Sequence, residues 1–274
     1  MEKVKRIKDL VKQLNEYRDA YYNEARPVVS DAAYDKLFDE LSELEKETGV
    51  VYANSPTQTV GYVVKSELEK VKHSHPMLSL DKTKSVNDLV KFSRDKDCIL
   101  SLKMDGLTCL LTYEDGVLVQ AETRGDGEIG ELITHNARVF ENIPLTIDYK
   151  GHFEIEGEAI ITYDDFNKIN EFLSDDKKYK NPRNLASGSV RQLDSKIASQ
   201  RHIKFIAWKV PTEVASNSFI NRLQYAAELG FDTVPFLPIR GNSNAEFINI
   251  VIEQLQRRAN EKSFPIDGLV ATYN

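Results

Sequence analysis

Two helical patterns open the chain. Apolar residues recur at three- and four-residue spacing over residues 4–21, which would place one apolar stripe along a helix. A second such pattern covers residues 31–48, with Ser30 as its N-cap and an acidic residue at its start, where the helix dipole favours negative charge. A turn-rich segment follows at 53–62. Residues 1–65 are therefore expected to form a small helical domain.

After residue 65 the pattern changes to alternating strands. Segment 99–105 alternates, with three apolar side chains on one face and Ser101, Lys103 and Asp105 on the other. Further strands are predicted over residues 107–113, 117–123, 153–161, 203–210 and 266–272, and helices near 217–229 and 244–258. The first two of these strands should form a β-hairpin across a Glu-Asp-Gly turn. Because strands and helices mix without a βαβ rhythm, an α+β fold with a mostly antiparallel sheet is expected over residues 66–274.

Composition restricts the partners of the chain. Of its 274 residues 41% are apolar, enough to bury a core, and no apolar run is long enough to span a bilayer. A monomeric cytoplasmic protein without a membrane partner is expected. The formal net charge of −7 argues against a surface that grips a phosphate backbone everywhere, so any contact with DNA should be local. Cys98 and Cys109 lie in apolar runs without metal-ligand spacing, and are expected to be reduced core residues rather than zinc ligands.

The polar face of segment 99–105 carries a candidate nucleophile. Lys103 and Asp105 project from the same face, and Gly106 follows directly, where the missing side chain would let a ligand approach the backbone. A surface lysine–aspartate pair on a half-exposed strand accounts for the same three residues at least as well. The motif alone leaves both interpretations open.

Four further segments place charged residues beside glycine or proline. They read TRGDGEIGE, FEIEGEA, NPRNLASGSVRQ and IDGLV, at residues 123–131, 153–159, 181–192 and 266–270. Arg124, Arg183 and Arg191 can fork onto phosphate oxygens. Glu158 can accept hydrogen bonds from ribose hydroxyls or help to hold Mg²⁺. Taken singly, each segment is more often a turn with a solvated charge.

Together and in this order, the segments resemble the nucleotidyltransferase (ATP-grasp-like) domain of bacterial NAD⁺-dependent DNA ligases, from about Tyr21 to the end of the chain. The resemblance implies that Lys103, with Asp105 and Glu158 as further catalytic residues, attacks the α-phosphate of NAD⁺, releases nicotinamide mononucleotide (NMN) and becomes lysyl-AMP. It implies Mg²⁺ as a cofactor with Glu158 as its candidate ligand, and transfer of the AMP to the 5′-phosphate of nicked double-stranded DNA in replication and repair. The segment HPMLSLD at 75–81 resembles the adenine-side loop. By resemblance the nucleotide contacts are Ser79, Leu80, Ser101, Gly106, Arg124, Arg183 and Arg191.

The segment YYNEARPVVSDAAYD at 21–35 resembles the signature of the helical domain with which these ligases hold NMN, a domain that ATP-dependent ligases lack. The implied nicotinamide-side residues are Tyr21, Tyr22, Asp31, Tyr34 and Asp35. Aromatic rings can stack on a cationic pyridinium, and carboxylates complement its charge. Packing of one helix on the other explains Tyr34 equally well. The segment favours NAD⁺ as the AMP donor over an ATP-using relative such as an RNA ligase or a capping enzyme.

Three positions depart from the family pattern. Ser101 stands where the family usually has a glutamate facing adenine, Glu156 where it has an arginine, and Thr272 where it has a lysine. A lysine amine, with an ordinary pKa of about 10.4, attacks only after losing its proton, and nearby cations favour that loss. The loss of two cations should therefore slow adenylation and leave phosphate charge less compensated.

Two expectations limit the predicted activity. The chain ends before the family's OB-fold, four-cysteine zinc site and helix-hairpin-helix elements, so nick sealing by this chain alone is not expected. Because of the three departures, a diverged module that binds NAD⁺ without catalysis stays open as the alternative to an active adenylation module.

Overall fold

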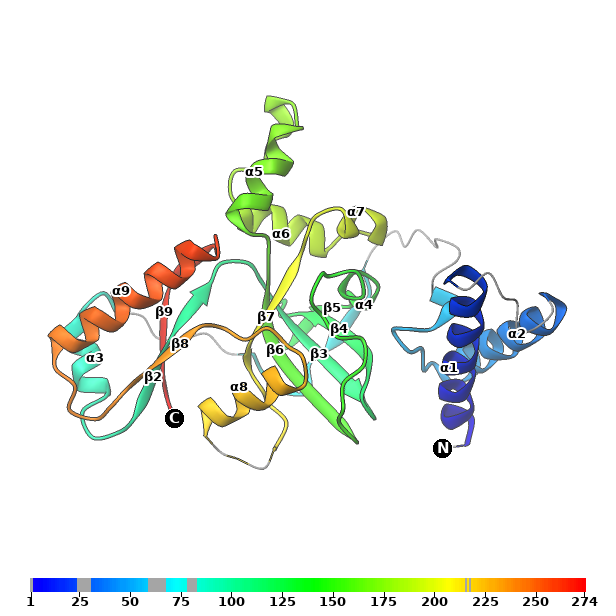
Figure 1. The fold of residues 1–274 in the computed structure, drawn as a ribbon, viewed down its shortest axis with the longest axis horizontal. Helices are drawn as coiled ribbons and strands as arrows, with labels where there is room; N and C mark the ends of the chain where they lie inside the picture. The colour runs from blue at the N-terminus through cyan, green and yellow to red at the C-terminus, as the bar shows by residue number, and fades with distance from the viewer. Residues whose placement is uncertain (1, 24–30, 59–67, 78–82, 215, 217) are drawn as a thin grey trace.

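The structure is a computed structural model that describes residues 2–23, 31–58, 68–77, 83–214, 216 and 218–274 (Figure 1). Its strands are β1 (Lys70–Lys72), β2 (Cys98–Met104), β3 (Leu107–Glu114), β4 (Val117–Thr123), β5 (Ile129–Glu131), β6 (His152–Ile160), β7 (Lys204–Lys209), β8 (Phe236–Ile239) and β9 (Ile266–Tyr273). Its helices are α1 (Glu2–Asn23), α2 (Asp31–Thr48), α3 (Val86–Phe92), α4 (Thr134–Ala137), α5 (Tyr163–Glu171), α6 (Pro182–Val190), α7 (Ser195–Ser199), α8 (Phe219–Glu228) and α9 (Ala245–Glu261). The strands form antiparallel sheets of order β4-β3-β6-β7, β8-β2-β9 and β1-β5. The expected α+β, mostly antiparallel class is confirmed.

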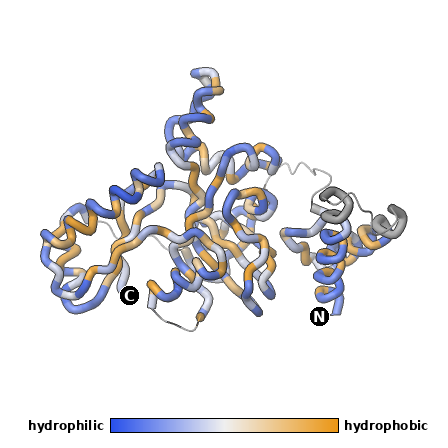
Figure 2. Tube along the Cα trace, in the orientation of Figure 1, coloured by the Kyte–Doolittle hydropathy of each residue, from blue (hydrophilic) through white to orange (hydrophobic). Residues whose placement is uncertain are grey.

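The four-stranded sheet has one apolar and one charged face. Along β6, Phe153, Ile155 and Ala159 are fully buried in the largest core cluster, and the glutamates that alternate with them point to the other face. Figure 2 shows hydrophobic positions concentrated in the strands of the two larger sheets. The predicted hairpin is also confirmed, because Asp115 and Gly116 join β3 to β4 with positive φ angles of 48° and 81°, as a two-residue type I′ turn requires.

The three-stranded sheet orients the candidate nucleophile. Leu100 and Leu102 of β2 are buried in a second core cluster together with Ile248 and Val251 of α9. Side chains alternate along a strand, so Lys103 points to the opposite side of β2. The apolar face predicted for segment 99–105 is therefore the face that α9 covers.

The N-terminal helices share a core with the hairpin. Ile7 and Leu14 of α1 pack with Leu41 of α2 and with Val117 of β4. The two helices predicted over residues 4–21 and 31–48 are confirmed as α1 and α2. In the part of the chain that the structure describes, no helix combines the length and the apolar composition needed to cross a membrane.

The sequence pattern did not indicate α6, whose segment was interpreted as a charged turn. Asn181 caps this helix, since its Oδ1 accepts a hydrogen bond from the backbone N–H of Asn184 at 2.8 Å. Pro182 occupies the first turn, where its missing N–H costs nothing. The Asn-Pro pair was a start signal that could have been used. The other elements missed are short: α3, α4, α5, α7, β1, β5 and β8.

Candidate active site

Lys103 lies near the end of β2, on the face away from α9. Its Nζ forms an ion pair with Oδ2 of Asp267 on β9. Strand register produces this pair, because Lys103 lies opposite Gly268. The lysine side chain is 38% exposed, so a substrate can reach it. Asp267 lies in a segment that the sequence had singled out, but no role was predicted for it.

Three predicted site residues gather beside this pair. Arg183 Nη1 lies 3.2 Å from Asp105 Oδ1, and Glu158 Oε2 accepts a hydrogen bond from Thr108 Oγ1 at 3.0 Å. Burial raises the pKa of Glu158 from 4.5 to about 7, although the Thr108 hydrogen bond and the charges of Arg183 and Lys103 oppose the rise. The site therefore combines an amine, a guanidinium and a carboxyl group that titrates near neutrality.

Gly106 joins β2 to β3 where the backbone of β6 comes close. A Cβ atom here would overlap the carbonyl oxygen of Ala159 and lie 2.9 Å from Ile160 Cγ2. The backbone of Gly106 also hydrogen-bonds Glu158. In the structure, close packing against β6 explains why a glycine occupies this position, whereas the sequence had suggested the approach of a ligand.

Arg124 lies in the tight turn at residues 123–127, between β4 and β5. Its Nε donates to the carbonyl oxygen of Met77 at 3.2 Å, and its backbone N–H donates to the carbonyl oxygen of Thr108 at 2.9 Å. The two glycines of the turn have positive φ angles of 55° and 101°. Asp126 Oδ1 accepts from two following backbone N–H groups at 2.9 and 2.8 Å, which lowers the pKa of Asp126. These bonds fix the turn beside Thr108.

Two other predicted nucleotide contacts bind protein groups. Arg191, which follows α6, forms an ion pair with Glu131 of β5, with 2.5 Å between Nε and Oε2. Ser101 is buried on the same face of β2 as Lys103, and its Oγ donates to the carbonyl oxygen of Val270 at 3.5 Å. The contacts described for Arg191 thus lead to β5 rather than to Lys103.

Glu156, one of the departures from the family pattern, has cationic partners. Its side chain is 1% exposed, and its Oε1 lies 2.6 Å from Lys209 Nζ and 2.7 Å from His75 Nε2. Lys209, His75 and Thr272 contribute to the lining of one cavity of about 560 Å³. Lys209 therefore supplies a cation beside the position where the resemblance implies an arginine, a pairing that no sequence pattern indicated.

The predicted nicotinamide-side and adenine-side residues lie largely outside the described part of the chain. The backbones of Tyr21 and Tyr22 belong to α1 and those of Asp31, Tyr34 and Asp35 to α2, but these five side chains lie outside the described structure, as do residues Ser30, Ser79 and Leu80. Cys98 and Cys109 are buried free thiols, as predicted. Among the described residues, no cluster of three or more His, Cys, Asp or Glu side chains is arranged to hold a metal ion.

Comparison with known proteins gives one family for both parts of the chain. Residues 65–274 match the NAD-dependent DNA ligase adenylation domain, and residues 1–61 match the DNA ligase-like, N-terminal NAD+-binding domain. The chain is 47% identical to a DNA ligase of Lachnoclostridium phytofermentans (99% of this chain, 42% of that protein) and 48% identical to one of Ruminiclostridium cellulolyticum (99% and 41%). A DNA ligase of Helicobacter pylori is 38% identical (95% and 41%). The chain thus spans about two-fifths of the length of these relatives.

Solved structures resemble the chain more weakly. A mycobacterial DNA ligase D complexed with ATP and MES aligns with a TM-score of 0.37 at 13% identity, over 73% of this chain and 56% of that one. A Naegleria gruberi RNA ligase mutant with AMP and Mn aligns with a TM-score of 0.34 at 11% identity, over 77% and 56%.

The antiparallel sheets, the helical N-terminus and the ion pair of Lys103 with Asp267 define the chain as an α+β protein with a lysine-centred candidate active site. Within this class it belongs to the NAD-dependent DNA ligase family, and it comprises the adenylation domain and the N-terminal NAD⁺-binding domain. The family predicted from the motifs is confirmed. The roles of the individual site residues stay predictions.

Proposed function

We propose that this chain is an active adenylation module in which Lys103 takes AMP from NAD⁺ and releases NMN. The supporting observation is the grouping of Lys103 and Asp267 with Asp105, Arg183 and Glu158. A lysine nucleophile must be accessible and must lie near groups that control its proton and the charge of the phosphate. This group of side chains meets both conditions.

The reaction needs a neutral amine at Lys103. The ion pair with Asp267 holds the charged form, and that carboxylate is the first acceptor for the proton that must leave. The lone pair of Nζ then forms a bond to the α-phosphorus, while the bond from this phosphorus to the NMN phosphate oxygen breaks and its electron pair leaves with NMN. Arg183, whose charge like that of Lys103 acts on Glu158, stabilises the charge that builds on the α-phosphate oxygens.

The carboxyl groups of the site fit a magnesium ion that also binds substrate. Mg²⁺ commonly binds one or two carboxylates together with substrate phosphates and water, so it needs no cage built only from protein groups. Glu158 and Asp105 would be the carboxylates that hold this ion. When bound, the ion would add positive charge at the phosphates, and it would favour the ionised form of Glu158, whose pKa is otherwise about 7.

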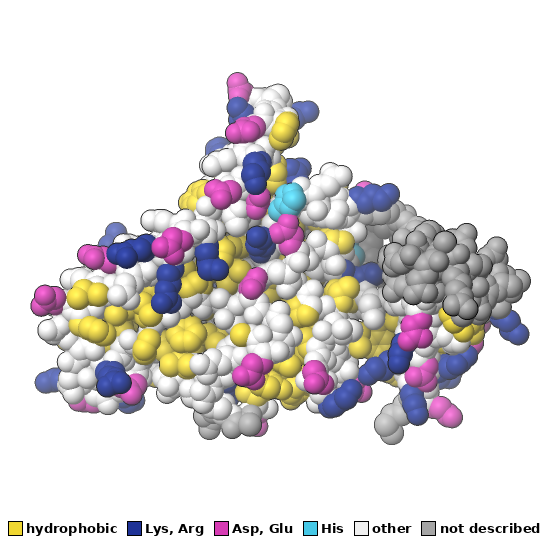
Figure 3. Space-filling model, in the orientation of Figure 1, with side chains coloured by type: hydrophobic (Ala, Val, Ile, Leu, Met, Phe, Trp, Pro, Cys, Tyr) yellow, Lys and Arg dark blue, Asp and Glu magenta, His cyan; other side chains and the backbone are white. Residues whose placement is uncertain are grey.

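We assign transfer of the AMP to nicked double-stranded DNA to ligases that have the full length of the relatives. The related DNA ligases are more than twice the length of this chain, since it covers 41–42% of them. Figure 3 shows Lys and Arg side chains mixed with Asp and Glu over the visible face. On this face, the mixture favours a local DNA contact at the adenylated lysine and not a broad basic surface.

Intact-mass measurement of the full chain with NAD⁺ and Mg²⁺ tests the proposal. The wild type should gain the mass of one AMP, Lys103→Ala should gain nothing, and the control Lys168→Ala, which alters an exposed lysine of α5, should react like the wild type. No gain by the wild type from about pH 6 to about pH 9, a range in which a perturbed lysine can lose its proton, would refute the proposal. NAD⁺ binding by calorimetry without any AMP transfer would establish the non-catalytic alternative instead.

A further inference from the structure

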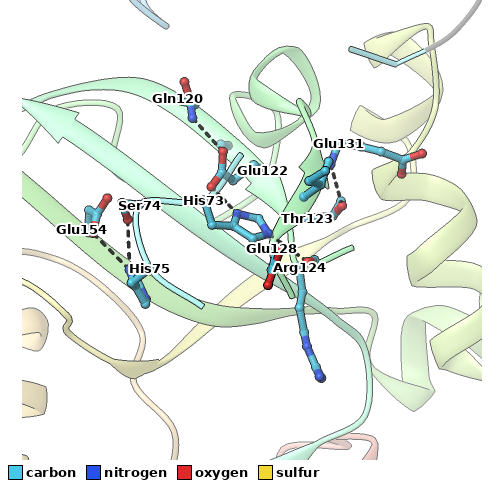
Figure 4. Close-up of polar contacts among 12 residues, drawn as sticks. His73, Ser74, His75, Gln120, Glu122, Thr123, Arg124, Glu128, Glu131 and Glu154 are labelled. Carbon is cyan, nitrogen blue, oxygen red and sulfur yellow. Dashed lines mark hydrogen bonds and ion pairs between the residues drawn. The ribbon is translucent and has the colours of Figure 1, made fainter. Parts of the chain in front are cut away.

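His73 is a buried residue of the charged face that has no part in the mechanism above (Figure 4). It follows β1, and its Nδ1 lies 2.5 Å from Oε1 of Glu122 on β4. Its Nε2 lies 2.8 Å from the carbonyl oxygen of Arg124. The side chains of His73 and Glu122 are 1% and 2% exposed. Water is therefore excluded from both contacts.

The partners of His73 determine how many protons its ring carries. A backbone carbonyl and an ionised carboxylate only accept hydrogen bonds, whereas a neutral imidazole has a single N–H to donate. Two short contacts to such acceptors therefore need both ring nitrogens protonated. Gln120 Nε2 donates to the other oxygen of Glu122 at 2.7 Å, so both oxygens of this carboxylate have a donor when His73 carries both ring protons.

The charges around the ring agree with this proton count. Burial alone would lower the pKa of His73, but its hydrogen bonds to Glu122 and Arg124 and the negative charges of Glu122 and Asp126 raise it. The guanidinium of Arg124 points away from the ring (Figure 4). From β5 the ring faces Gly130, where a Cβ atom would lie 2.6 Å from His73 Cε1. The imidazole fits here because Gly130 has no side chain.

The segment that starts at His73 hydrogen-bonds both the backbone and the side chain of Arg124. The ring binds the carbonyl oxygen of Arg124, and the carbonyl oxygen of Met77, four residues further on, accepts from Arg124 Nε. The N–H of Arg124 binds the carbonyl oxygen of Thr108, whose hydroxyl donates to Glu158. A continuous set of hydrogen bonds therefore connects His73 with the candidate active site.

We propose that His73 is an imidazolium, paired with Glu122, and a positioning residue that fixes the backbone of Arg124 so that its guanidinium faces the phosphates of NAD⁺. Arg124 touches the substrate, and His73 acts through it. Only the effect on AMP transfer rests on the proposed function. The protonation of the ring and the position of the turn do not depend on it.

Nitrogen-15 NMR of the full chain with labelled histidine tests the proton count near pH 7. The protein has five histidines, and comparison with His73→Gln assigns the signal of His73. Both ring nitrogens should show bonded protons. A ring with one bare nitrogen would overturn the imidazolium. The backbone N–H signals of Gly125 and Gly127 should shift in His73→Gln and stay unchanged in the control His202→Gln, which alters an exposed ring paired with Glu141.

A double-mutant cycle tests whether His73 acts through Arg124. His73→Gln should lower the single-turnover rate of AMP transfer about tenfold, the effect of one lost positioning hydrogen bond, and should add little in the Arg124→Ala background. A general loss of structure would instead give independent losses that multiply in the double variant, and this result would refute positioning. If the wild type transfers no AMP, the proposed function fails, and the turn signals of Gly125 and Gly127 alone decide the positioning role.

Discussion

The raised pKa of Glu158 makes stability depend on pH in a way that one substitution isolates. In the unfolded chain this carboxyl has its ordinary pKa of 4.5, and in the folded protein the value is about 7. Folding therefore favours the protonated form, so the stabilising effect is complete below about pH 4.5 and is lost as pH rises to about 7. At 1.36 kcal/mol per pH unit, the difference corresponds to about 3 kcal/mol. Glu158→Gln removes this dependence while keeping an acceptor for Thr108.

Urea unfolding of the wild type and Glu158→Gln at several pH values measures this loss. The free energy of unfolding of the wild type, relative to the variant, should fall by about 2 kcal/mol between pH 5.5 and pH 7 and then level off. The control Glu171→Gln, at an exposed glutamate of α5, should run parallel to the wild type. A constant difference between wild type and Glu158→Gln across this range would show that Glu158 is ionised throughout and would refute the argument from burial.

Two further substitutions test the packing of the site. Gly106→Ala should cost about 2 kcal/mol of unfolding free energy, because the new methyl overlaps the backbone of β6. The control Gly188→Ala on α6 should be neutral or stabilising, because the nearest atom to the new methyl would be 3.9 Å away. Equal effects of the two substitutions in urea unfolding would contradict this prediction. Lys209→Met should lower the free energy of unfolding by about 2 kcal/mol, because it removes one cation from the buried carboxylate of Glu156. This loss is smaller than for a fully buried ion pair, since Lys209 is 41% exposed. Glu156→Gln in the same chain should restore most of that loss, and no recovery would show that the pair is unimportant.

Local patterns in the sequence predicted the parts of the fold that repeat with a short period. Alternation over 99–105 assigned Lys103 to the face away from the core, and the Asp-Gly pair predicted the turn between β3 and β4. Tertiary pairing has no such period. Glu156 and Lys209 are 53 residues apart, and His73 and Glu122 are 49 apart. These contacts arise from sheet order, which the alternation of single strands does not determine.

The ion pairs of the site differ in how readily their cations can leave the carboxylate and bind a phosphate. Arg183 is 59% exposed in its pair with Asp105, and such a pair is worth about 1 kcal/mol or less, so this arginine can turn to a bound phosphate at little cost. Lys209 cannot do the same, because its departure would leave the buried Glu156 short of positive charge. Phosphate binding should therefore draw on Arg183 and leave Lys209 in place. On this reasoning Lys209 balances Glu156 but does not replace the phosphate contact that the resemblance implies at position 156.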